Sequence, residues 1–156
     1  MIDNVETKVY ETGGSMSSED KLAVATFLYK HLDEYGDPLD DILKSIEYAT
    51  NSVYGGKVLT AQLGTETCGA VILNNTGMVG YIPETILVYI AVHENYRGKG
   101  IGKLLMKKAI EETNGNIALH VEEDNPAKFL YEKVGFSKKY AEMRYIRLNY
   151  GIFKHG

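Results

Sequence analysis

A glycine-rich loop between an apolar strand and a helix constrains this chain more than any other feature. Residues 86–92 read Ile-Leu-Val-Tyr-Ile-Ala-Val, which is typical of a strand covered on both faces. A helix is predicted over 101–112, and the loop before it reads Arg97-Gly98-Lys99-Gly100. Glycines permit positive φ and close backbone approach, and a helix N-terminus points unpaired N–H groups to the same place. Such a loop is suited to holding a phosphate or pyrophosphate.

Three kinds of phosphate loop come into question. A Walker loop requires Ser or Thr after its lysine, whereas Lys103 is followed by Leu104. A dinucleotide fingerprint would require glycine in place of Lys103, although Glu122 or Glu123 could serve as its acidic ribose partner. That nicotinamide-nucleotide alternative stays open at this point. The third kind depends on a second segment further along the chain.

The second segment, residues 117–136, combines a strand, a short helix and a glycine stop. Alternation predicts a strand from Ile117 to Val121, and Asp124 or Asn125 can cap a helix that begins at Pro126. Gly135 is expected to end that helix.

Together the two segments resemble the acetyl-CoA-binding segments of the GCN5-related N-acetyltransferase (GNAT) family. The first matches as Arg97-x-x-Gly100-x-Gly102 after a Val-rich strand. The second matches as a Leu-x-Val strand, an Asn, a short helix with Ala and Tyr, and a closing Gly-Phe. The resemblance implies one acyl-CoA N-acyltransferase domain over 1–156, of mixed α+β class with a central mixed sheet and helices on both faces. It also implies transfer of the acetyl group of acetyl-CoA, a co-substrate, to a primary amine by direct attack in a ternary complex. A catalytically silent acyl-CoA-binding regulatory domain is the alternative.

The resemblance also implies site residues. Tyr131 matches the family's tyrosine that protonates the departing thiolate. The general base is left open between His120, Glu84 (if the central strand extends so far) and a water relay; a histidine with a reference pKa of about 6.5 suits the task at neutral pH. The residues expected to contact acetyl-CoA are Ile90, Ala91, Val92, Arg97, Gly98, Lys99, Gly100, Ile101, Gly102, Lys103, Asn125 and Tyr131.

The composition limits the kinds of partner and site that we expect for this protein. The content of 44% hydrophobic and 24% charged residues is that of an ordinary globular protein, and no apolar run approaches the ~18 residues of a membrane span. Cys68 is the only cysteine, which excludes an internal disulfide and agrees with a cytoplasmic location. The four histidines show no paired ligand spacing, so we expect no metal site. We also expect no nucleic-acid or membrane partner, and a homodimer is compatible with the sequence.

The charge is divided along the chain. Residues 1–50 carry eleven acidic residues against four lysines, a net −7, whereas residues 51–156 carry ten acidic and thirteen basic residues, a net +3. The positive part contains both expected acetyl-CoA segments. The acidic part is either a solvated surface or attracts a cationic acceptor, which could be a small molecule or a peptide amine.

Periodicity and turn signals predict the element order β-α-α-β-β-β-α-β-α-β. Apart from the segments above, the strands are expected near 5–10, 57–63 and 67–73, and the helices over about 19–35 and from 39 to about 51. Residues 138–148 are predicted to close the chain as one or two further strands.

Overall fold

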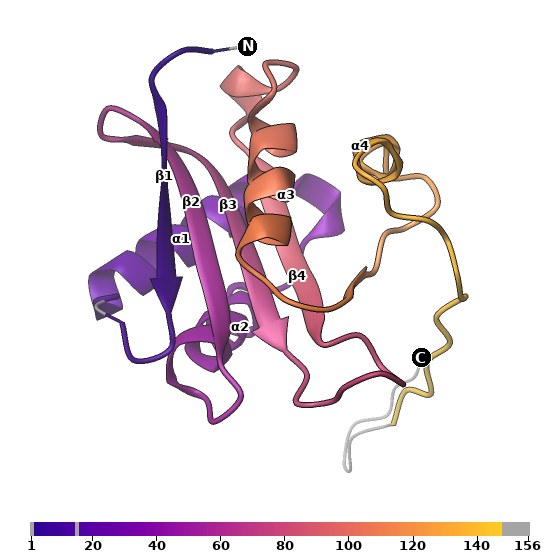
Figure 1. Cartoon of the computed structure of the whole chain (residues 1–156). Helices are drawn as coiled ribbons and strands as arrows, with labels where there is room; N and C mark the ends of the chain where they lie inside the picture. The colour runs from indigo at the N-terminus through magenta and orange to yellow at the C-terminus, as the bar shows by residue number, and fades with distance from the viewer. Residues whose placement is uncertain (1, 15, 148–156) are drawn as a thin grey trace.

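The computed structural model describes residues 2–14 and 16–147, which build one mixed sheet covered by helices (Figure 1). The strands are hydrogen-bonded in the order β1-β2-β3-β4-β5. The first three pairings are antiparallel, and β4 pairs with β5 in parallel. Their bounds are β1 (Val5–Glu11), β2 (Gly56–Leu63), β3 (Glu66–Asn75), β4 (Thr85–Val92) and β5 (Ile117–Leu119).

Helices lie on both faces of the sheet, which confirms the expected fold class. Figure 1 shows α3 (Ile101–Glu111) in front of the strands, with α1 (Ser18–His31) and α2 (Leu39–Asn51) behind them. The short helix α4 (Lys128–Lys133) belongs to the same hydrophobic core as α3. Two 3-10 turns, η1 (Asp33–Tyr35) and η2 (Glu94–Tyr96), follow α1 and β4 respectively.

The central strands are buried on both sides because their side chains alternate between two cores. In β2, Val58 packs with α1 and α2, whereas Leu59 and Ala61 pack with α3. In β3, Ile72 packs with α1 and α2, whereas Val71 packs with α3. Burial on both faces explains why these strands read as apolar runs.

The first helix begins as the sequence indicates and ends earlier. The Ser17 hydroxyl accepts from the Asp20 N–H at 3.0 Å, and the Asp20 carboxylate accepts from the Ser17 N–H in return, so the two residues form a capping box. The helix was expected to reach Tyr35 but ends at His31. Asp33 has a φ of +56°, which is incompatible with continuing the α-helix, and η1 follows.

Two predicted elements after α3 are shorter than expected. The strand expected over 117–121 comprises only Ile117–Leu119, because β4 offers it partners from Thr85 to Leu87 alone. His120 and Val121 therefore lie beyond the ladder. The short helix begins at Lys128 instead of Pro126, because the Asn125 side chain first makes a turn with the Ala127 N–H.

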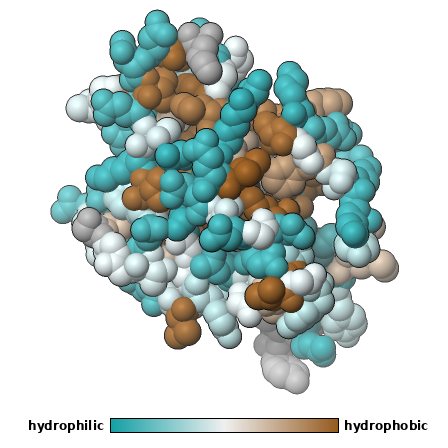
Figure 2. Space-filling model, in the orientation of Figure 1, coloured by the Kyte–Doolittle hydropathy of each residue, from teal (hydrophilic) through white to brown (hydrophobic). Residues whose placement is uncertain are grey.

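The prediction of closing strands over 138–148 is wrong for residues 138–147, none of which forms a strand. Leu148 lies outside the described residues. Residues 137–147 are all exposed; Lys138 forms an ion pair with Glu123 outside the segment, whereas Arg144 pairs with Glu142 within it. Figure 2 shows an opening between this segment and the body of the molecule. Among the described residues, no helix combines the length and apolar character that crossing a membrane requires.

Candidate active site

A bulge and a separation of strands open one edge of β4. The β3–β4 register shifts between Ile72 and Leu73, which leaves Val88 as an extra residue in β4. On the other side β4 pairs with β5 only as far as Leu87. From Val88 to Val92, this edge has no strand partner within the described part of the chain. An extended ligand arm can therefore pair with it as an added strand.

The expected cofactor contacts on β4 lie in this open stretch. Ala91 is buried in the core under α1, whereas Ile90 and Val92 are half-buried and pack toward α3 and α4. The backbone of these residues leads from the bulge directly to the glycine loop.

The three glycines of the loop serve different purposes. Gly98 and Gly100 have φ values of +77° and +89°, which favour glycine, and a Cβ added to Gly98 would meet no atom within 4 Å. Gly100 is the N-cap of α3 and supplies no side-chain cap, so the first-turn N–H groups remain free for an anion. A Cβ on Gly102 would lie 2.9 Å from Leu130 Cδ2, so this glycine lets α4 pack closely on α3.

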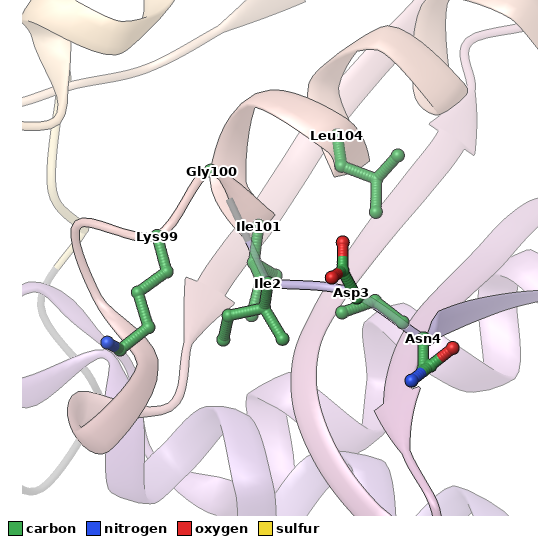
Figure 3. A pocket seen from close by; sticks show the side chains of 8 residues that line it. Ile2, Asp3, Asn4, Lys99, Gly100, Ile101 and Leu104 are labelled. Atoms are coloured by element: carbon green, nitrogen blue, oxygen red, sulfur yellow. The ribbon is translucent and has the colours of Figure 1, made fainter.

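The rest of the loop supplies positive charge and a shallow cavity. Lys99 and Lys103 are exposed beside the α3 N-terminus, where the helix dipole adds to their field, whereas Ile101 is buried beneath them. A cavity of about 330 Å³ lies next to this terminus, and Figure 3 shows the side chains that line it. It is lined by Ile2, Asp3, Asn4, Val5, Lys99, Gly100, Ile101 and Leu104.

The Arg97 guanidinium is engaged within the protein. Its Nε donates to the Val92 carbonyl at 3.1 Å and its Nη2 donates to the His31 carbonyl at 2.7 Å. Its Nη1 forms an ion pair with Asp33 at 3.1 Å. Arg97 therefore ties the end of β4 to the end of α1, and its charge is already partly balanced.

Tyr131 is held by the end of its own helix. Gly135 has a φ of +114° and donates to the Glu132 carbonyl, and the Phe136 N–H donates to the Tyr131 carbonyl at 2.9 Å. This is a Schellman motif, and its hydrophobic contact is the Phe136 ring, 6.3 Å from the Tyr131 ring. Tyr131 is only 8% exposed, and burial raises its pKa to about 12.

The structure separates the two candidate bases. Glu84 precedes β4, so the strand does not extend to it, and its carboxylate accepts from the Gly80 and Asn116 N–H groups at 2.9 and 2.7 Å. These bonds lower the pKa of Glu84, which favours a role in holding the loop before β4. His120 is exposed just beyond β5 and lies near Glu142, whose pKa is lowered chiefly by the hydrogen bond from Arg144 and to a smaller extent by His120.

Two polar residues near the opposite side of β4 were not predicted as a pair. The Tyr89 hydroxyl donates to the Asp37 carboxylate, and burial followed by this bond raises the pKa of Tyr89. Asp37 precedes α2, which has no side-chain cap, and its carboxylate faces β4 instead. The only sequence signal for this pair was Tyr89, a side chain with a polar hydroxyl within an otherwise apolar strand. A hollow of about 590 Å³ beside them is lined by Tyr29, Lys30, Asp33, Gly36, Asp37 and Pro38.

Comparison with known proteins agrees with this geometry. The family model described as an acetyltransferase (GNAT) domain matches residues 55–138, more than half of the chain. The [ribosomal protein bS18]-alanine N-acetyltransferase of Haemophilus influenzae is 36% identical over 77 residues, which cover 43% of this chain and 53% of that protein. The chain thus spans about half the length of the curated relative it matches.

Solved structures share the fold at low identity. A transcriptional regulator from Bacillus halodurans superposes with a TM-score of 0.68 at 19% identity, covering 91% of this chain and 100% of its own. An aminoglycoside acetyltransferase from an uncultured soil metagenomic sample gives 0.66 at 17% identity, covering 96% and 100%. The Escherichia coli ribosomal-protein-S18-alanine N-acetyltransferase gives 0.63 at 20% identity, covering 93% and 83%.

Proposed function

This chain belongs to the GNAT family of acetyltransferases, and from that premise we propose that it transfers the acetyl group of acetyl-CoA to a primary amine. The observation that carries the proposal is the continuous path from the open edge of β4 to the glycine loop. An extended pantetheine arm requires unpaired strand backbone, and a pyrophosphate requires free N–H groups. Both occur here within fifteen residues of chain, from Val88 to Gly102.

Acetyl-CoA would lie along β4 with its pantetheine arm paired to the backbone near Ile90 and Val92. The pyrophosphate would be bound by the N–H groups of residues 98–103, with Lys99 and Lys103 adding positive charge. Gly102 contributes indirectly, because its missing side chain allows Leu130 to pack against the α3 N-terminus. Arg97 acts through the positions of the chain it joins, since its guanidinium donates to Val92 and His31.

The reaction is a direct displacement at the thioester. A neutral amine attacks the carbonyl carbon, the tetrahedral intermediate collapses with cleavage of the C–S bond, and the electron pair leaves on sulfur. The amine must first lose a proton, because alkylammonium groups have a reference pKa of about 10.4. The nitrogen gives up a further proton after attack, and the thiolate finally accepts one.

Tyr131 would stabilise the thiolate chiefly as a hydrogen-bond donor. Its pKa of about 12 keeps the phenol protonated throughout the neutral range. Complete proton transfer to an alkylthiolate, whose acid has a pKa of about 8.5, would be uphill by about 5 kcal/mol. A donated hydrogen bond needs no such transfer and strengthens as charge develops on sulfur.

His120 is the better of the two candidate bases. Glu84 accepts two backbone N–H bonds that stabilise its ionised form and weaken it as a base. His120 is exposed beyond β5, so it can pass a proton to solvent. A water relay does the same without a single base. His120→Gln therefore separates them: a large fall in kcat supports the histidine, and an unchanged kcat supports the relay.

The acceptor is proposed to be cationic. The hollow between α1 and α2 is lined by Asp33 and Asp37, and Asp40 and Asp41 follow in the first turn of α2. Their field would concentrate positively charged amines near this side of β4. The Haemophilus relative is named for acetylating an alanine of a ribosomal protein, so a peptide with a free N-terminus is included with small diamines in the test panel.

Two measurements test the proposed function. Acetyl-CoA should raise the free energy of unfolding by about 2.7 kcal/mol at a hundredfold excess over its Kd, and NADH should not. Free CoA should be released only when an amine is added. Stabilisation by CoA without amine-dependent turnover would instead identify a silent acyl-CoA-binding domain.

A further inference from the structure

Two histidines from distant parts of the sequence are stacked next to the glycine loop. The ring centroids of His31, at the end of α1, and His93, just after β4, are 4.3 Å apart with planes tilted by 33°. The Phe27 ring lies 4.6 Å from His31, and the Tyr96 ring lies 5.3 Å from His93. His31 is only 5% exposed, so this pair is part of the packing between α1 and the loop.

Each histidine accepts a hydrogen bond from the backbone of the turn η2. His31 Nδ1 accepts from the Glu94 N–H at 3.3 Å, and His93 Nδ1 accepts from the Asn95 N–H at 3.1 Å. A ring nitrogen can accept only when it is unprotonated, whereas both nitrogens of an imidazolium are donors. Protonation at either Nδ1 therefore turns an acceptor into a donor that faces an N–H group.

The charged surroundings of the pair are mixed. From β3, the Glu66 carboxylate lies 3.7 Å from His93 Nε2 and accepts from the Tyr96 hydroxyl, and the Cys68 carbonyl accepts from the His93 N–H. Lys30 of α1 and Arg97 disfavour a charged His31, whereas Glu94 favours it. Asp33 of η1 is paired with Arg97. Burial first, and then the neighbouring His93, lower the pKa of His31.

The pair is connected to the phosphate loop through Arg97. The His31 carbonyl accepts from Arg97 Nη2, and Arg97 is the residue directly before Gly98. If η2 separates from α1, Arg97 loses its anchor on the His31 carbonyl, and the loop that begins there loses its fixed position. The loop geometry thus depends on both imidazoles being neutral.

We propose that His31 and His93 form a pH-sensitive latch that holds the phosphate loop for acyl-CoA at neutral pH and releases it in mild acid. This inference rests on the proposed function, because it takes the loop to be the acyl-CoA phosphate site. The bound state requires neutral rings, so acyl-CoA binding expels protons from the latch. Because the pKa of His31 is lowered in the closed latch, the latch favours binding at neutral pH and loses this effect as the pH falls from the ordinary histidine pKa of about 6.5 through the lowered value.

The test measures the affinity for dephospho-CoA between pH 7.5 and 5.5. This probe lacks the 3′-phosphate, whose second pKa of about 6 would obscure the effect. The Kd should rise at least about threefold over this range, with an upper limit of tenfold per pH unit for one linked proton. The double variant His31→Asn with His93→Asn should show no such rise, because an amide oxygen can accept the same N–H bonds without titrating.

The controls separate the possible failures. His120→Asn removes a histidine outside the pair, and the Kd of this variant for dephospho-CoA should depend on pH as in the parent. If the pH dependence disappears in His120→Asn, the effect belongs to His120 and the latch is refuted. The latch is also refuted if the Kd of the double variant for dephospho-CoA depends on pH as strongly as that of the parent. If the double variant does not fold, calorimetry on the parent at pH 6 in two buffers decides, because dephospho-CoA binding must release protons. Absence of binding at pH 7.5 would refute the proposed function instead.

Discussion

Replacing Tyr131 by Phe isolates the phenol from the ring that surrounds it. The ring is buried in the core under α3 and packs against Phe136, and Phe keeps all of this contact. The hydroxyl makes no hydrogen bond to any described residue, so its removal should leave the free energy of unfolding unchanged or slightly raised. The Kd for CoA should also stay the same, because the phenol acts mainly as charge develops on sulfur.

The loss should appear in kcat. A hydrogen bond to an ionised group contributes about 1.5–3 kcal/mol, which corresponds to a fall of about tenfold to about 150-fold. The pH profile adds a second signature, because a pKa of about 12 leaves Tyr131 protonated across the accessible range. We therefore expect the parent enzyme to show no falling limb due to Tyr131 below about pH 11.

The assay is single-turnover release of CoA with saturating amine, so that chemistry limits the rate. Tyr48→Phe is the matched control, because its hydroxyl donates to the Asn75 carbonyl far from the loop, and this variant should turn over like the parent. A Tyr131→Phe variant with undiminished single-turnover rate would remove the phenol from the mechanism.

Three further perturbations test other parts of the account. The triple change Asp37→Asn, Asp40→Asn and Asp41→Asn should raise KM for a dicationic amine most at low salt and leave the acetyl-CoA KM alone, since the Debye length is about 10 Å at 0.1 M; equal KM values at low ionic strength would make the carboxylates a solvated surface. Thr60→Val should raise the free energy of unfolding in urea by about 1 kcal/mol, because the buried Thr60 hydroxyl has no partner among the described residues; a loss would contradict this. Glu84→Gln should lower stability at pH 7, and the difference should shrink as the pH falls below about 4.3, because the pKa of Glu84 is lower in the folded state; a difference independent of pH would refute the structural role.

The local features predicted best were those fixed by neighbours in the sequence. The positive φ at Gly100 and the stop at Gly135 each depend on one turn of backbone, so residue type indicates them directly. The glycine loop and α3 were predicted from the sequence for the same reason.

The features missed depend on long-range packing. Nothing adjacent to His31 or His93 indicates that a chain reversal of sixty-two residues would stack their rings, and four scattered histidines were read as unrelated. The bonds from the Arg97 guanidinium to the His31 carbonyl and to Asp33 also join distant segments, so the sequence around Arg97 does not indicate them. Strand propensity over 138–147 did not produce a strand there, because a strand also requires a partner.

The central claim is tested most directly by following an isotope-labelled acetyl group from acetyl-CoA into an amine. The panel should contain a monoamine, a diamine and a peptide with a free N-terminus, and the enzyme should be compared with Gly100→Glu. That variant places a side chain and a negative charge where Gly100 has a φ of +89° at the α3 N-terminus. We expect label in at least one amine with the parent enzyme and none with the variant. Equal labelling by both would contradict the assignment of the loop, and no labelling of any amine by a parent that binds acetyl-CoA would contradict acetyl transfer.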